Sequence, residues 1–472
     1  MSQPKVAYQA AWVVGCRILG IGSTLASNIV VARLLKPEGL GAFLLATTVL
    51  SFGVILALSG LSEAGLRLIS ENLGLHRERN ALAYLRTTMR WACISSVVVT
   101  AIIVIFLLLG LQFSIYSKLT PTTIALIGLG VVVLAWQQLM AQLLRSFNDL
   151  RAASFFSGGQ TGGPLSNIIF LIPLLMAFYW LIPITDIQVI GLLVGSIVVT
   201  LPLAFWELSR SGRTLFAAAS AVERVPLLST ERRELASVAA SLLGIQVLAF
   251  VTVQSDIWIG SLMLVPHELG LYGAAKRTQL IAHMPLQMAL MTIQATIPRL
   301  YAQERIEDLE NRYRTAITYA AMPATIGIVI FACFPAAVLT ILFGDEFAAA
   351  SNIVPPLFVG LAALVFLGSP ADILTMTGNH RLVLRINMLS AIALVVGGIV
   401  GAYFAGALGL AIGSSIAAFA QNVLLWWIAK KKLGVWTHLK LIPWRLLNQP
   451  KPPTSSLVGE IVRHKPKDAN AS

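Results

Sequence analysis

The stretch LKPEGLGAF at residues 35–43 returns later in the chain as LVPHELGLY at residues 264–272. Leu, Pro, Leu, Gly and an aromatic residue match in register, and the two prolines lie 229 positions apart. A proline followed by an acidic residue is typical of a helix start. Two further pairs of residues follow in the same order at nearly the same shift: Arg67 with Arg299, and Asn148 with Asn379. The repeat therefore predicts two related halves.

The composition places the chain in a membrane. The 472 residues have a mean hydropathy of +0.80, and 12% of them are charged, against about 25% in soluble domains. A helix needs roughly 20 apolar residues to cross the hydrocarbon core. Twelve stretches meet this length: 8–35, 39–70, 82–110, 121–147, 152–180, 188–209, 236–264, 269–299, 314–343, 351–376, 383–405 and 408–430. The stretch 8–35 is too long for the core of a signal peptide, so we expect it to be the first transmembrane span.

The loops set the topology, because Lys and Arg gather in alternate loops, which stay on the cytoplasmic side. We therefore predict an all-α membrane protein of about 12 transmembrane helices, in two pseudo-symmetric six-helix lobes with both termini cytoplasmic. This duplicated construction is usual for secondary transporters. The expected parts are an N-lobe (1–209), a cytoplasmic linker (210–235), a C-lobe (236–430), a basic interfacial segment (431–449) and a disordered cytoplasmic tail (450–472). The interleaved aromatic, apolar and basic residues of the interfacial segment favour a helix that lies flat on the inner leaflet.

The net charge of +13 is spread over inner loops and the tail, which favours anionic inner-leaflet lipids as partners and argues against nucleic acid. Cys16, Cys93 and Cys333 each lie alone in an apolar span, so we expect neither a disulfide nor a metal site. The chain carries no P-loop, HExxH or Ser-His-Asp motif, and we expect no enzyme activity and no cofactor. Coupling to a proton or to sodium is left open.

The eighth stretch carries the clearest candidate site. Its polar residues share one helical face: Tyr272, Lys276, Gln279, His283, Gln287 and Gln294. Because a charged residue at the bilayer centre is costly, we expect this face, with the neighbouring Arg277, to line an aqueous cavity that binds substrate. The alternative is that the cations reach toward the interface and the glutamines hold helices together.

Three charged positions accompany this stripe in other spans. Arg17 lies near the centre of the first span, on a polar face shared with Asn28, and is expected to face the same cavity. Asp256 is expected to pair with Arg17, Lys276 or Arg277, or else to bind a coupling cation. For Glu63, we expect an i,i+4 ion pair with Arg67. Arg33, at the outer end of the first span, is expected to extend toward the interface.

The ordered motifs resemble a known family, the polysaccharide and O-antigen exporters (lipid-linked oligosaccharide flippases) of the multidrug/oligosaccharidyl-lipid/polysaccharide (MOP) superfamily. The resemblance rests on these stretches: ARLLKPEGLG at residues 32–41, DIWIG at 256–260, LGLYGAA at 269–275, IPRL at 297–300, Phe343-Gly344 and GNHR at 378–381. It implies two six-helix lobes around a central, often cationic cavity.

The resemblance also implies a function. Such a protein would flip an undecaprenyl-diphosphate-linked oligosaccharide across the bacterial inner membrane by alternating access, with polysaccharide polymerase or assembly proteins as partners. Arg17, Lys276 and Arg277 would hold the diphosphate or acidic sugars, and Tyr272 and the glutamines would bind sugar hydroxyls. Two alternatives stay open: a cation-coupled multidrug antiporter of the same superfamily, and a membrane-embedded glycan polymerase or glycosyltransferase. The antiporters often carry a carboxylate in the first span, and the enzymes carry a large periplasmic loop.

Overall fold

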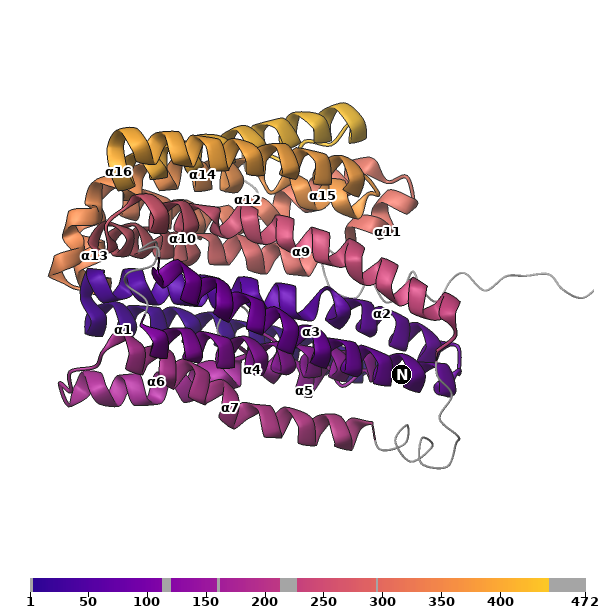
Figure 1. Ribbon diagram of the computed structural model, residues 1–472. Helices are drawn as coiled ribbons and strands as arrows, with labels where there is room; N and C mark the ends of the chain where they lie inside the picture. Colours follow the sequence, from indigo (N-terminus) through magenta and orange to yellow (C-terminus); the bar gives the residue numbers. More distant parts are fainter. Residues whose placement is uncertain (1–2, 113–119, 159–161, 213–226, 294–295, 441–472) are drawn as a thin grey trace, which may run out of the picture.

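The computed structural model describes residues 3–112, 120–158, 162–212, 227–293 and 296–440, and every element described is helical. The first half contains α1 (Gln3–Leu58), α2 (Leu61–Gly74), α3 (Glu78–Gln112), α4 (Pro121–Ser146), α5 (Leu150–Phe156), α6 (Pro164–Tyr179) and α7 (Asp186–Ser211). The second half contains α9 (Ser229–Met263), α10 (Pro266–Ile293), α11 (Thr296–Ala302), α12 (Ile306–Cys333), α13 (Pro335–Phe343), η1 (Asp345–Asn352), α14 (Val354–Leu367), α15 (Pro370–Met376) and α16 (His380–Leu433). The two halves lie side by side as two layers, indigo to magenta and salmon to yellow (Figure 1).

The expected helical class is confirmed, whereas the expected number of crossings stays a prediction. Seven of the described helices are long and apolar enough to cross a membrane, and the bent pair η1 and α14 would make an eighth. Two of the seven, α1 and α16, are divided by non-helical backbone, at Lys36 and at Ala405 and Gly406. The expected span at 152–180 is also divided, into α5 and α6.

The repeated stretches sit at equivalent structural positions. The break in α1 at Lys36 immediately precedes Pro37, and α10 begins at Pro266. Proline fits the first turn of a helix because it lacks the amide hydrogen that would have no partner there. Both stretches therefore start helical segments, as their sequence predicts, and α1 and α10 pack directly against each other.

A polar latch joins the two halves beside the break in α1. The ammonium group of Lys36 contacts a carboxylate oxygen of Glu346 in η1 at 2.7 Å. Arg33 donates hydrogen bonds from Nε to the Leu342 carbonyl, at 2.9 Å, and from a terminal nitrogen to the Ile341 carbonyl. Arg33 thus stays exposed while it binds the end of α13, and the expectation that it extends toward the interface stays a prediction. The last turn of α13 leaves carbonyl groups without helical partners, and a guanidinium group satisfies them.

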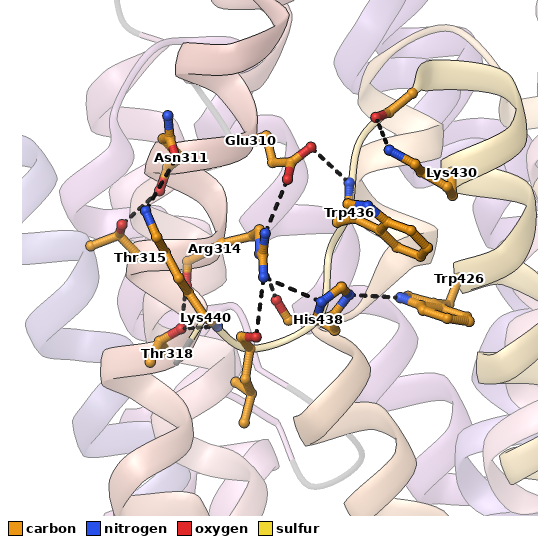
Figure 2. Close-up of polar contacts among 12 residues, drawn as sticks. Glu310, Asn311, Arg314, Thr315, Thr318, Trp426, Lys430, Trp436, His438 and Lys440 are labelled. Carbon is orange, nitrogen blue, oxygen red and sulfur yellow. Dashed lines mark hydrogen bonds and ion pairs between the residues drawn. The ribbon is translucent and has the colours of Figure 1, made fainter. Parts of the chain in front are cut away.

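A short strap, residues 434–440, follows α16 and binds back onto the second half (Figure 2). The Trp436 amide donates to Glu310 at 3.0 Å, Arg314 donates to the His438 carbonyl at 3.0 Å, and the Lys440 amide donates to Thr318 at 3.0 Å. The strap thus fastens α16 to α12. Two further hydrogen bonds, from Thr437 and Leu439, reach the end of α14 at Leu367 and Phe366.

The interfacial helix expected at 431–449 is wrong for the part that the structure describes. Residues 431–433 still belong to α16, which ends at Gly434 in a left-handed conformation (φ 71), and 434–440 form no helix. The hydrogen bonds to α12 and α14 satisfy the strap backbone instead. Residues 441–449, the tail 450–472 and most of the expected linker between the lobes lie outside the described residues.

Candidate functional site

A cavity of about 470 Å³ opens between the two halves, and most of its wall belongs to the second half. From the first half, α1 contributes Thr24, Leu44 and Thr48. The rest of the lining comes from α9, α10, α14 and α16. Thr24 precedes the break in α1, Leu44 and Thr48 follow it, and the strap binds the end of α14, a helix that also lines the cavity. The predicted stripe on the eighth span lies on α10, and four of its members or neighbours line the cavity: Lys276, Arg277, Gln279 and His283.

An ion pair forms the polar centre of the cavity wall. The Lys276 ammonium lies 2.5 Å from a carboxylate oxygen of Asp256 in α9, and it also donates to the Val253 carbonyl at 2.6 Å. The second carboxylate oxygen of Asp256 accepts a hydrogen bond from the Tyr272 hydroxyl at 2.7 Å. Among the partners considered for Asp256, the structure thus selects Lys276. Tyr272 is fully buried, so its hydroxyl serves the carboxylate and is not presented to a ligand.

Arg277 differs from its neighbour. It lines the same cavity, but it makes no hydrogen bond or ion pair with any residue that the structure describes. A guanidinium group presents five N–H donors and stays charged, so one that faces a cavity without a partner is suited to an anionic ligand.

The amide residues of the stripe are partly occupied by the protein. Gln279 donates to the Leu357 carbonyl of α14 at 2.6 Å, and its amide oxygen has no described partner. Gln287 and His283 contact each other through Nε2 and Nδ1 at 3.2 Å. Gln287 does not line the cavity. The side chain of Gln294 lies outside the described residues. The predicted stripe therefore divides into a part that faces the cavity and a part that serves helix contacts.

The candidate residues of the first half lie elsewhere. Arg17 has an exposed side chain on α1 and does not line the cavity. Asn28 is buried and donates to the Thr24 carbonyl of its own helix at 2.8 Å. Thr24, which lies between Arg17 and Asn28 on α1, does line the cavity.

The ion pair predicted between Glu63 and Arg67 is not formed. Glu63 lies in the first turn of α2, where the positive end of the helix dipole stabilises a carboxylate, and Arg67 is exposed. In the described residues, neither side chain has an ion-pair partner within 4.0 Å.

Several polar residues of the cavity were not among the predicted site residues. Gln254 and Thr252 of α9, Ser415 and Asn422 of α16, and Thr48 of α1 all line it. In the sequence, such residues can be recognised only as amide or hydroxyl groups within a long apolar span. Residues of this kind also hold helices together, and only the packing of the helices shows which of them line a cavity.

The charges and the lining define what the cavity can bind. Its charged lining residues are Asp256, Lys276 and Arg277, which sum to one net positive charge. Amide and hydroxyl groups from α1, α9, α10 and α16 surround them. This combination favours a ligand that joins an anionic group to a polar, hydroxyl-rich portion.

Comparisons with known proteins identify the family and the fold. The family model described as "Polysaccharide biosynthesis protein" matches residues 10–303. The fold is similar to an inward-facing multidrug resistance MATE family transporter of the MOP superfamily, with a TM-score of 0.67, 16% identity, and coverage of 90% of this chain and 98% of that one. It is also similar to the lipid II flippase MurJ in an inward closed conformation, with a TM-score of 0.63, 13% identity, and coverage of 90% and 87%. The comparison with curated proteins gives no match.

These relatives are transporters and flippases rather than enzymes, so the polymerase or glycosyltransferase alternative is set aside. The family match covers more than half of the chain, and the fold matches cover nine-tenths of it. The chain therefore belongs to the polysaccharide biosynthesis protein family, a polysaccharide exporter family of the MOP superfamily of membrane transporters.

Proposed function

We propose that this protein flips an undecaprenyl-diphosphate-linked oligosaccharide from the cytoplasmic to the periplasmic leaflet of a bacterial inner membrane by alternating access. The observation that carries the proposal is the cavity between the halves, which presents Arg277, a cation without a partner in the described part of the chain, among amide and hydroxyl groups. A diphosphate supplies the anion and an oligosaccharide supplies the hydroxyls. The membership of the polysaccharide biosynthesis family supports the same substrate class.

The dimensions of the cavity suit the polar part of such a substrate. Its volume of about 470 Å³ lies within the roughly 300–1,000 Å³ usual for ligand sites. The lipid chain is apolar and loses nothing by staying in the bilayer, so only the diphosphate and the first sugars need the cavity.

The cavity charge argues against the second candidate, a cation-coupled multidrug antiporter. A site for cationic drugs is expected to carry net negative charge, because opposite charges attract in a medium of low dielectric constant. The net charge here is positive. The first span also carries Arg17 where the antiporters often carry a carboxylate.

Complementation of a flippase-deficient host tests the proposal. Arg277→Gln should reduce surface polysaccharide at least tenfold, because the cavity then loses its unpartnered cation. Arg312→Gln, an exposed arginine of α12 outside the cavity, is the matched control and should export normally. Immunoblots of membranes check that all variants insert to the same level. Normal surface polysaccharide in Arg277→Gln at that level would overturn the proposal.

A further inference from the structure

The adjacent cations Lys276 and Arg277 differ in what already binds them. Two of the three ammonium donors of Lys276 are used at short distance, 2.5 Å to Asp256 and 2.6 Å to the Val253 carbonyl. Arg277 has no such partner among the described residues. An anion that enters the cavity therefore meets one available cation and one that is already neutralised.

The carboxylate that holds Lys276 is itself fixed in place. One oxygen of Asp256 accepts from Tyr272 at 2.7 Å, and the other accepts from the Ile257 amide at 2.9 Å as well as from Lys276. The Asp256 side chain is 9% exposed, and that of Lys276 is 23% exposed. Asp256 cannot turn away to follow a ligand, and an anion that removes Lys276 leaves a buried carboxylate without its cation, which is unfavourable.

We infer that Asp256 is a specificity-determining residue that acts through Lys276: it occupies Lys276 in place of a second phosphate and leaves Arg277 to bind the anionic group of the ligand. This inference rests on the proposed function and adds a division of roles within the site. In the conformation described, the cavity binds a phosphate-bearing lipid chiefly through Arg277. Removal of the Asp256 charge releases Lys276 and adds a second cation, which favours a diphosphate over a monophosphate.

Equilibrium binding to the purified, full-length protein tests the division. The probes are farnesyl monophosphate and farnesyl diphosphate, measured by calorimetry in detergent at neutral pH. Arg277→Gln should weaken the binding of both probes about tenfold. The paired variant Asp256→Asn/Lys276→Gln should leave either dissociation constant within about twofold, because it removes a cation together with the carboxylate that already neutralises it. Asp256→Asn, which keeps the size of the side chain and a hydrogen-bond acceptor for Tyr272, should tighten diphosphate binding at least fivefold, and monophosphate binding by less.

The double variant separates this role from a merely structural one. In the Asp256→Asn background, Lys276→Gln should abolish the gain and return the diphosphate affinity to within about twofold of the unchanged protein. A residue that only holds α9 to α10 would give no such dependence of one substitution on the other. Melting temperatures of all variants show that each is folded.

The outcomes separate the inference from the proposed function. If the unchanged protein binds both probes and the paired variant Asp256→Asn/Lys276→Gln weakens binding as much as Arg277→Gln, the division of roles is wrong while the anionic substrate stands. A loss of diphosphate affinity in Asp256→Asn contradicts it in the same way. If the unchanged protein binds neither probe, the cavity is no anion site and both conclusions fall together.

Discussion

Gly41 of α1 and Gly270 of α10 occupy equivalent positions of the repeated stretches, and each lies against the proline carbonyl of the other stretch. A Cβ atom on Gly41 would lie 2.5 Å from the Pro266 carbonyl oxygen, and one on Gly270 would lie closer still to the Pro37 carbonyl oxygen. The contact is reciprocal, as expected when two related units meet at a pseudo-twofold axis. The repeat is thus also a place where the backbones of the two halves approach closely.

We expect Gly270→Ala to destabilise the protein by about 1–3 kcal/mol, the usual range for overpacking, because the added methyl group meets backbone that cannot turn away. Gly244→Ala in α9 is the matched control. Nothing lies within 4 Å of a Cβ atom there, and alanine favours helix over glycine by about 1 kcal/mol. Melting temperatures in detergent should fall for the first variant and hold or rise for the second. Equal effects would show that the close approach is not what requires the glycine.

The Lys36–Glu346 pair of the latch should bias the opening of the two halves at this end. Both side chains are at least half exposed, at 70% and 50%, so water and salt screen the pair and it shifts the opening equilibrium only modestly. Lys36→Glu should widen the distance between spin labels at Leu181→Cys and Phe404→Cys in a cysteine-free background. The exchanged pair, Lys36→Glu with Glu346→Lys, should restore the narrow distribution. If it does not, the charges are not what holds the halves together.

The strap should loosen in mild acid. Both ring nitrogens of His438 face N–H groups: Nδ1 lies 3.3 Å from the Trp426 indole nitrogen, and Nε2 lies 3.2 Å from Arg314. Burial, with the charges of Arg314 and Lys430, lowers the pKa of His438, and Glu310 opposes this only in part. The bound strap therefore favours the neutral ring. Its stability is complete above the ordinary pKa of about 6.5 and is lost as the pH falls below it.

Hydrogen exchange of the strap amides measures this effect. After correction for the intrinsic exchange rate, protection of the Leu439 and Lys440 amides should decrease between pH 7 and pH 5. His438→Gln should show a protection that does not change over this range. A pH dependence that persists in His438→Gln would assign the effect to another group.

Arg17 should not contribute to binding at the cavity, because its side chain does not line it. Arg17→Gln is expected to leave the dissociation constant of farnesyl diphosphate within about twofold, since the exposed Arg17 side chain contributes nothing to the cavity wall. Arg277→Gln, in the same assay, should weaken binding about tenfold. A tenfold loss in Arg17→Gln would move the anion site toward the first half and contradict the cavity assignment.

Much of the fold was predictable because it depends on local sequence. Apolar length specifies the spans, and Pro266 with Glu268 marks the start of α10, whose polar stripe follows from helical spacing alone. Where a span is interrupted, prediction failed: α5 and α6 were expected as one helix, since apolar length does not report a local break. The strap was expected as a helix because its aromatic, apolar and basic residues fit an amphipathic pattern.

The sequence by itself determined that this chain is a duplicated, helical membrane protein with cations in its spans, because hydropathy, repeat spacing and charge are properties of short segments. Only the tertiary structure decided which cations face a cavity. Lys276 and Arg277 are neighbours in sequence, yet one is bound by Asp256 and the other is not. Asp256 lies 20 positions before Lys276, and its position depends on how α9 packs against α10, which no local pattern specifies.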